Sequence, residues 1–161
     1  MAIEKVREYM KPFGLDKSIR EFDVSSATVE LAAAALGTEG ARIAKTISLH
    51  GKDGGCILIV TAGDTKSDNH KFKERFGFKP KMLSFDEVPI LTGHAVGGVC
   101  PFANPEGAEV WIDESLRRFE TIFPACGSAN SAIELVPDTL YQISNARGWV
   151  DVCKSAVPAS V

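Results

Sequence analysis

The sequence predicts an α+β fold in which helices flank a mixed, largely antiparallel β-sheet. Two observations lead to this class. The clearest strand-like runs, at 43–50 and 56–62, are joined by a short glycine-rich loop, which is typical of an antiparallel hairpin. Helical segments and further strands accompany them without the regular strand–helix alternation of a parallel βαβ fold.

Three elements precede the hairpin. Apolar residues at helical spacing predict a helix over 3–13, and the glycine that follows marks its end. The mixed run at 18–24 predicts a strand. A second helix is expected over 28–36, with Ser25 or Ser26 as its N-cap and a glycine just beyond its last turn.

Shorter elements and loops follow the hairpin. Residues 68–76 predict a third helix, which Gly77 ends. Ser84 and Glu87 have the spacing of a capping box and predict the start of a short helix. Three glycines and two prolines make 93–105 a loop. The remaining expected elements are strands at 109–113, 120–124, 131–136 and 149–153 and a helix at 137–145.

The composition is that of an ordinary globular chain and excludes several functions. A length of 161 residues fits one domain spanning 1–161. The net charge of −3 argues against polybasic coating of nucleic acid. No apolar run approaches the ~18 residues of a membrane span, and the charged N-terminus lacks the apolar core of a signal peptide. The sequence therefore predicts a cytoplasmic protein without membrane association.

The cysteines and histidines are scattered along the chain. Cys56, Cys100, Cys126 and Cys153 form no CxxC pair, and no Cys/His cluster has the spacing of a zinc site. A reducing cytosol would leave these thiols free. We therefore expect neither a metal site nor another cofactor.

Lys45 is the first candidate functional residue. It lies in a strongly apolar predicted strand, where side-chain alternation places it on the face of Ile43 and Ile47. A lysine on such a face is costly unless its charge meets an anion or a polar cleft. Two interpretations remain open: a cation aimed at a phosphate or carbonyl, and an edge lysine that extends to water.

Two loops of small residues are the next candidates. The segment 97–101 contains two glycines, which allow backbone N–H groups to approach a ligand and stabilise an oxyanion. The segment 127–131 is also small and polar. Either segment can instead be an ordinary turn. Cys100 suggests a thiol nucleophile only if it meets a partner such as His94 in space.

Residues 66–81 form a basic segment in an acidic chain. Six Lys and Arg residues against two acidic residues give it a net charge of +4, so the rest of the chain carries −7. A solvated helix face is the simpler interpretation. The alternative is a phosphate-binding surface for one nucleic-acid strand or end.

Together, these segments resemble the YbaK/EbsC family, which is related to the editing insertion domain of bacterial prolyl-tRNA synthetase. The resemblance covers nearly the whole chain in order. The matching segments are Val6–Tyr9, Leu31–Leu36, Arg42–Thr46, Ile57–Val60, Gly63–Asp64, Gly93–Phe102, Gly127–Ser128 and Ala132–Leu135, followed by the predicted helix at Pro137.

The resemblance implies which residues form the site. Lys45 matches the family's essential strand lysine, and Gly97 to Pro101 match its GxxxP loop. Cys100 stands where many members have serine, and Asn130 replaces the aspartate or histidine of some subgroups. The implied catalytic residues are Lys45, Gly97 and Gly98, and the substrate-binding residues are Thr46, Cys100, Pro101, Ser128, Ala129 and Asn130. The basic segment, independently of the resemblance, supplies the candidate tRNA-binding residues Lys66, Lys71, Lys73 and Arg75.

The resemblance also implies an activity, which is trans-editing hydrolysis of Ala- or Cys-tRNA(Pro). A ribose hydroxyl of the substrate would assist the attacking water, Lys45 would hold a phosphate or the substrate's polar end, and the Gly97–Gly98 backbone would stabilise the carbonyl oxygen. Small residues at 128–129 would limit the pocket.

The implied partners are mischarged tRNA and prolyl-tRNA synthetase. A chain of 161 residues leaves no room for a synthetase catalytic domain, so we expect action in trans. The alternatives are a module that binds aminoacyl-tRNA or an amino acid without turnover, and a hydrolase that uses Cys100.

Overall fold

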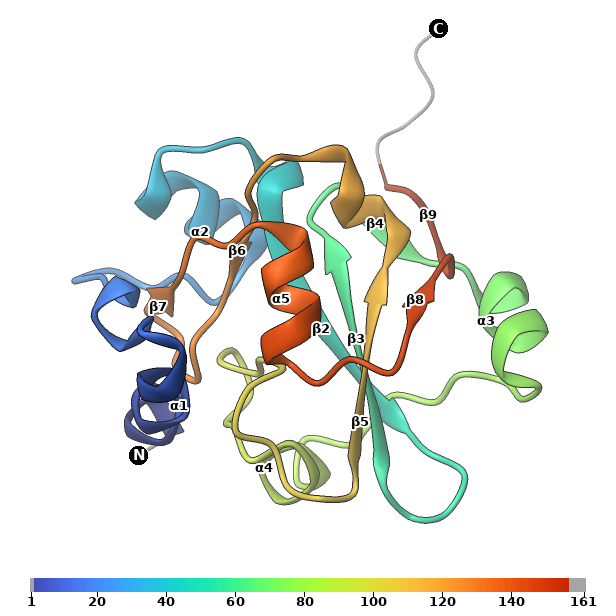
Figure 1. Ribbon diagram of the computed structural model, residues 1–161. Coiled ribbons are helices and arrows are strands. Elements are labelled where there is room, and N and C mark those ends of the chain that lie inside the picture. The colour runs from blue at the N-terminus through green and yellow to red at the C-terminus, as the bar shows by residue number, and fades with distance from the viewer. Residues whose placement is uncertain (1, 157–161) are drawn as a thin grey trace, which may run out of the picture.

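The computed structural model, which describes residues 2–156, has a five-stranded sheet at its centre (Figure 1). The strands are β1 (Arg20–Glu21), β2 (Ile43–His50), β3 (Cys56–Ala62), β4 (Thr65–Ser67), β5 (Ala108–Asp113), β6 (Phe123–Pro124), β7 (Ser131–Ala132), β8 (Trp149–Val150) and β9 (Cys153–Ser155). The α-helices are α1 (Ala2–Met10), α2 (Val29–Leu36), α3 (Asn69–Phe76), α4 (Glu87–Thr92) and α5 (Pro137–Ile143). Short 3₁₀ helices are η1 (Lys11–Phe13), η2 (Asp16–Ser18), η3 (Gly40–Arg42) and η4 (Glu114–Arg118). Residues 1 and 157–161 of the predicted domain lie outside the described residues.

The hairpin predicted from the sequence forms the middle of the central sheet, whose strand order is β6-β2-β3-β5-β8. β2 and β3 have the predicted bounds and pair antiparallel, from Ala44 opposite Ala62 to His50 opposite Cys56. The other pairs of this sheet, β2–β6, β3–β5 and β5–β8, are parallel. The small sheets β1–β7 and β4–β9 are antiparallel. The predicted α+β fold, with helices flanking a mixed, largely antiparallel sheet, is confirmed: the longest ladder, β2–β3, and both small sheets are antiparallel, while the remaining pairs of the central sheet are parallel.

The predicted helix ends are present in the structure. Gly14, Gly37 and Gly77 each adopt a positive φ where a helical segment stops. The Ser84 N–H donates to the Glu87 carboxylate at 2.9 Å, and the Glu87 N–H donates to the Ser84 hydroxyl at 3.3 Å. This reciprocal pair is the predicted capping box, and it fixes the turn that leads into α4.

The N-cap of α2 differs from the prediction. Thr28, not Ser25 or Ser26, accepts a hydrogen bond from the Leu31 N–H at 3.2 Å. The two serines lie earlier in the chain, where their hydroxyls donate to the Ala129 carbonyl at 3.5 and 3.3 Å. They therefore connect the approach to α2 with the loop before β7.

Several strands are shorter than predicted. The expected strands at 18–24, 120–124 and 131–136 contain only the two-residue strands β1, β6 and β7. The expected strand at 149–153 is two strands, β8 and β9, which belong to different sheets. Between them, the Val152 N–H donates to the Asp113 carboxylate at 2.9 Å. The short strand β4 was not predicted.

β3 is buried along its whole length because side chains cover both faces of the sheet. On one side, Leu58 packs in a cluster with Val6 of α1 and Leu140 of α5, the helix in front of the sheet in Figure 1. On the other side, Ile59 packs with Phe72 of α3. Each face of the sheet therefore packs against a different set of helices.

The same alternation orients the side chains of β2. Thr46 lies opposite Val60 and shares the face of the first cluster, whereas Lys45 lies opposite Thr61 on the face of Ile47. This is the face predicted for Lys45. Adjacent residues at the edge of the sheet thus direct side chains to opposite faces.

Candidate functional site

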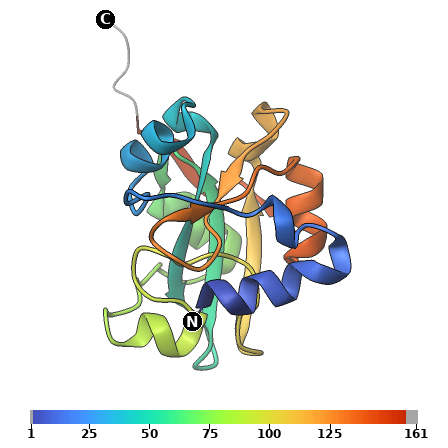
Figure 2. The ribbon, with the colours of Figure 1, turned by 90° about the vertical axis from the view of Figure 1, so that its left-hand side faces the viewer.

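A cavity of about 570 Å³ opens beside the middle of β2. Its wall is formed by the start of α2, by β2, by residues of the 82–88 segment that leads into α4, by the loop around Gly97, and by residues at β6 and β7. In Figure 2, α2 (light blue) lies above and α4 (yellow-green) below on the same side of the molecule. The cavity is therefore assembled from segments distant in sequence.

Lys45 is the one ionisable side chain among the described residues that line this cavity. Hydroxyl groups and small apolar side chains make up much of the remaining wall. The hydroxyl residues are Ser26, Thr28, Thr46, Ser48 and Ser131, and the alanines are Ala27, Ala32, Ala44, Ala125 and Ala132. Such a wall accepts a small group, and it offers no lining carboxylate, imidazole or thiol.

The ammonium of Lys45 is held at the cavity wall. It donates a hydrogen bond to the carbonyl of Thr65, in β4. Burial of the side chain lowers the pKa of Lys45 from its ordinary value, while the nearby charges of Asp64 and Glu30 act in the opposite direction. Lys45 is thus not fully exposed, and it is not paired with any carboxylate of residues 2–156, which leaves its charge available to an anion.

The backbone of Thr46 faces the cavity at an open stretch of the sheet edge. Antiparallel register pairs alternate between hydrogen-bonded and non-bonded pairs. The Ser48 carbonyl and the His50 N–H both point away from β3, toward Leu83 and Lys81. Thr46 lies two residues before Ser48 on the same strand, and alternate residues of a strand direct their backbone groups to the same side. The N–H and C=O of Thr46 therefore also point away from β3. β6 pairs with β2 only as far as Ala44, so the register gives Thr46 no strand partner.

Of the two glycines in the loop at 97–101, only Gly97 lines the cavity, together with Val99. Gly97 lines the wall with a φ of +92°, a conformation that favours glycine. The Gly98 N–H already donates to the Ala95 carbonyl at 3.0 Å, and Gly98 packs directly on the backbone of Ser128. Cys100 and Pro101 are buried and are not part of the cavity lining. Gly98 therefore supports the loop rather than presenting a free donor.

Cys100 and His94 do meet in space, but not as a nucleophile and base. His94 Nε2 lies 2.7 Å from the Phe102 carbonyl oxygen, which can only accept a hydrogen bond, so this nitrogen carries the proton. The same nitrogen is 3.4 Å from Cys100 Sγ and cannot remove the thiol proton. Burial raises the pKa of Cys100 to about 12 and lowers that of His94. Both side chains are inaccessible.

The predicted residues Ser128, Ala129 and Asn130 lie beside the cavity rather than in its wall. The Asn130 side chain donates to the Phe22 carbonyl at 2.9 Å, and the Ala129 carbonyl accepts from the Ser26 N–H at 2.6 Å. These bonds hold the 127–131 loop against the segment 22–26, which precedes α2. The small residues that line the wall nearby are instead those of β6 and β7 and their neighbours.

The four predicted tRNA-binding residues lie on α3 and β4, outside the cavity lining. Lys71 donates to the Asp151 carboxylate at 3.1 Å and to the Cys153 carbonyl at 2.8 Å. Arg75 lies over the ring of Trp111, 4.9 Å from its centre. Lys66 lies opposite Lys154 in the β4–β9 pair. Lys73 is exposed.

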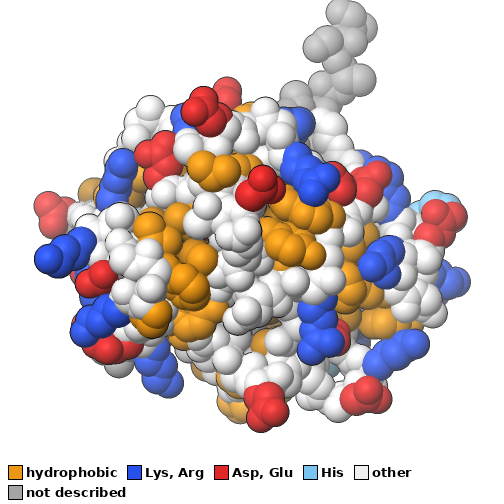
Figure 3. Space-filling model, in the orientation of Figure 1, with side chains coloured by type: hydrophobic (Ala, Val, Ile, Leu, Met, Phe, Trp, Pro, Cys, Tyr) orange, Lys and Arg blue, Asp and Glu red, His pale blue; other side chains and the backbone are white. Residues whose placement is uncertain are grey.

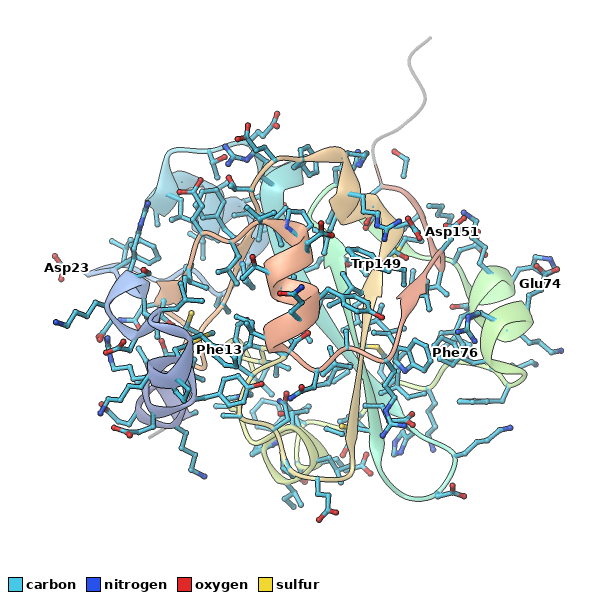
Figure 4. The ribbon with its side chains drawn as sticks, viewed as in Figure 1. Phe13, Asp23, Glu74, Phe76, Trp149 and Asp151 are labelled. Carbon is cyan, nitrogen blue, oxygen red and sulfur yellow. The ribbon has the colours of Figure 1, made fainter. Side chains whose placement is uncertain are left out.

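Acidic side chains interrupt this basic region. Glu74 and Asp151 both lie on the side of the molecule that carries α3 (Figure 4). Glu74 is 3.0 Å from His70. On the face shown in Figure 3, Lys and Arg side chains are spread around the periphery and alternate with acidic ones. Lys66 follows Thr65, whose carbonyl accepts the hydrogen bond from Lys45. One end of the basic region is therefore linked to the cavity.

Sequence reasoning missed the segment 82–88, which forms part of the cavity wall. Met82 and Phe85 line the cavity and are nevertheless 61% and 75% exposed. The available signal was an aromatic residue inside the Ser84–Glu87 capping box, where a polar residue would be expected. Within residues 2–156, no group of three or more His, Cys, Asp or Glu residues is placed to hold a metal ion. No helix in that range is long and apolar enough to cross a membrane.

Comparison with known proteins gives four related matches. A family model described as "Aminoacyl-tRNA editing domain" matches residues 23–143. "Uncharacterized protein YwhH" of Bacillus subtilis (strain 168) is 50% identical over 154 residues, covering 96% of this chain and 98% of the relative. The "Putative Cys-tRNA(Pro)/Cys-tRNA(Cys) deacylase EbsC" of Enterococcus faecalis (strain ATCC 700802 / V583) is 26% identical over 121 residues, 74% of each chain. The solved structure described as "Crystal structure of a putative trans-editing enzyme for prolyl tRNA synthetase" has the same fold, with a TM-score of 0.85 at 24% identity over 96% of this chain and 98% of that one.

Proposed function

Because the chain belongs to the aminoacyl-tRNA editing domain family, we propose that it hydrolyses the ester of a mischarged aminoacyl-tRNA in trans. The partner is the tRNA, whose acceptor end brings the ester to the cavity beside β2. The products are the free amino acid and the uncharged tRNA. We expect this activity in the cytoplasm, where tRNA is charged.

The observation that carries the proposal is the chemistry of the cavity wall, with Lys45 as its one ionisable side chain among the described lining residues. An aminoacyl ester has a reactive carbonyl, so its hydrolysis needs a positioned water more than a protein nucleophile. The water oxygen attacks the carbonyl carbon, and the bond to the ribose oxygen breaks. The neighbouring ribose hydroxyl accepts the water proton and passes a proton to the leaving oxygen, which supplies the acid–base group that the wall lacks.

The protein's contribution is then orientation and charge stabilisation. The N–H groups of Gly97 and Thr46 donate to the carbonyl oxygen as negative charge develops there. The Thr46 carbonyl accepts from the α-ammonium of the amino acid. Lys45 binds the phosphate of the terminal nucleotide. Each of these groups belongs to a residue that lines the cavity.

Small side chains in the wall set the proposed specificity. Ala32, Ala125 and Ala132 come from three different segments and limit the space for the substrate side chain. A rigid wall rejects a larger group by steric clash even where attraction discriminates weakly. We propose alanine or cysteine as the amino acid removed and tRNA(Pro) as its carrier, so that prolyl-tRNA synthetase supplies the substrate.

The direct test is deacylation of Ala-, Cys- and Pro-tRNA(Pro), each carrying a labelled amino acid, at micromolar enzyme. Ala- or Cys-tRNA(Pro) should be hydrolysed and Pro-tRNA(Pro) spared. Lys45→Met, prepared in the same way, controls for contaminating esterase. Failure to hydrolyse any mischarged tRNA in a wider panel would overturn the proposal.

The lack of an acid–base side chain in the wall also suits a second candidate, a module that binds aminoacyl-tRNA without turnover. The same deacylation samples distinguish the two functions. Tight binding of the intact mischarged tRNA, with the ester preserved over the time course, supports the binding module. Multiple turnovers support the deacylase.

A further inference from the structure

Two large apolar side chains are exposed at the mouth of the cavity. Phe85 is 75% exposed and Met82 is 61% exposed, yet both line the cavity. Leu83 and Val88, from the same segment, are buried. The segment therefore anchors itself with two apolar side chains and leaves two others facing solvent beside the site.

The backbone that carries these exposed side chains is held in place by hydrogen bonds to β2. The His50 N–H donates to the Lys81 carbonyl at 2.8 Å, and the Leu83 N–H donates to the Ser48 carbonyl at 3.2 Å. The capping box then fixes the turn that contains Phe85. A ligand that stacks on Phe85 consequently meets a backbone that is already ordered, which lowers the entropic cost of binding.

Exposed cations precede the aromatic side chain in the sequence. Lys81 lies four residues and Lys79 six residues before Phe85, and the residue directly after Phe85 is Asp86. Neither lysine forms an ion pair with any residue of the described range 2–156. An exposed aromatic ring that follows unpaired cations in the chain suits a nucleotide, because the ring stacks on the base and the cations attract phosphate.

We propose that the nucleobase at the 3′ end of the tRNA stacks on Phe85, with Met82 extending the apolar contact. This inference rests on the proposed function, because it places the base at the cavity mouth while the amino acid occupies the interior. Phe85 is then a positioning residue that fixes the ester relative to Thr46 and Gly97. Stacking requires no hydrogen bond to the base, so it accepts any terminal nucleotide.

The experiment compares two RNA probes and three variants. The probes are the trinucleotide CCA and the same molecule with an abasic third residue, and their Kd values are measured by NMR titration of the full chain. The variants are Phe85→Ala, Phe85→Tyr and the matched control Ile90→Ala. Ile90 is 74% exposed on α4 but is not part of the cavity lining.

Phe85→Ala should weaken CCA binding at least about fivefold, the lower end of what stacking on one base contributes. Phe85→Tyr and Ile90→Ala should leave the Kd within twofold of the parent value. The abasic probe should bind the parent protein as weakly as CCA binds Phe85→Ala. In deacylation assays, Phe85→Ala should raise KM by the same factor with little change in kcat.

Equal affinity of the parent protein for both probes would overturn the proposal, since the phosphates would then account for binding. Equal losses in Phe85→Ala and Ile90→Ala would also overturn it. If no mischarged tRNA is hydrolysed but CCA binding still depends on Phe85, the deacylase function fails and the base site stands. If hydrolysis is observed but KM and Kd are unaffected by Phe85→Ala, the base site fails alone.

Discussion

His94 Nε2 and Cys100 Sγ lie 3.4 Å apart in the core, yet the imidazole cannot activate the thiol. The proton on that nitrogen is donated to the Phe102 carbonyl at 2.7 Å. Burial favours the uncharged form of both side chains, lowering the pKa of His94 and raising that of Cys100 to about 12. The pair therefore has a packing role and anchors in the core the same loop that carries Gly97.

Cys100→Ser should retain kcat/KM for the mischarged tRNA within about threefold, because the thiol has no chemical role. The shorter hydroxyl replaces a thiol whose sulfur lies 3.9 Å from the Phe102 carbonyl oxygen, so we expect any cost in stability rather than in chemistry. Initial deacylation rates, measured at a temperature where circular dichroism shows both proteins folded, check this. A hundredfold loss in the folded variant would restore the cysteine-hydrolase hypothesis.

Lys45→Met should reduce kcat/KM by about 10–100-fold, because this residue binds the terminal phosphate and a hydrogen bond to a charged group contributes about 1.5–3 kcal/mol. Methionine keeps the apolar stem but removes the ammonium that donates to the Thr65 carbonyl. Single-turnover deacylation measures the effect on catalysis, and thermal unfolding measures the effect on stability. Lys52→Ala, at an exposed position in the hairpin loop, is the control and should behave as the parent protein. Near-parent activity in Lys45→Met would remove this residue from the mechanism.

The double variant Lys66→Glu/Lys73→Glu should weaken tRNA binding and flatten its salt dependence. Each phosphate contact contributes about 0.7–0.9 to the slope of log K against log salt concentration, so two lost contacts reduce the slope by up to about 1.8. Affinity measured at several potassium chloride concentrations checks this. Lys71 is a poorer choice because Asp151 already pairs with it. An unchanged slope would assign α3 to the solvated-face interpretation.

Local sequence signals predicted the features that depend on neighbouring residues in the chain. The glycine-rich loop predicted the β2–β3 hairpin, and side-chain alternation predicted the face of Lys45. The resemblance to the YbaK/EbsC family, drawn from the order of such segments, is confirmed by the family match. The parallel pairs of the central sheet carried no local signal. β6 and β8 contribute only two residues each, and β5 pairs with β3, a strand distant in the sequence.

The cavity wall was harder to predict because it is a tertiary property. Ala132 and Phe85 reach the same cavity from segments with no common motif. The Gly97–Gly98 pair was predicted as two donors, but the turn bond that occupies the Gly98 N–H depends on the path of the loop back to Ala95. Spacing identified the loop, whereas only the fold distinguishes its two glycines.

Asp64→Asn should destabilise the protein at neutral pH by about 0.5–1 kcal/mol, because the pair is partly exposed to solvent. Arg118 donates to both oxygens of Asp64, at 3.0 and 2.6 Å, and these bonds lower the pKa of Asp64 below its ordinary value. A lowered carboxyl pKa stabilises the fold above the unfolded-state value, near 3.9, and that stability is lost as the pH falls through the folded-state value. Urea unfolding at pH 7 and at successively lower pH should show the two proteins converging in acid. A constant difference at every pH would contradict this assignment.

Gly98→Ala tests whether the packing of Gly98 on Ser128 positions the neighbouring Gly97. A Cβ atom at Gly98 would lie 2.8 Å from three atoms of Ser128, including its backbone N and C, so the 127–131 loop must move. Forced packing of this kind costs about 1–3 kcal/mol, and the shift also displaces the Gly97 N–H, which should lower kcat/KM at least about tenfold. Gly107→Ala is the matched control, since its Cβ would make only an ordinary contact at 3.8 Å. Urea unfolding and deacylation rates test both effects. Parent-like stability and activity in Gly98→Ala would mean that this contact does not set the position of Gly97.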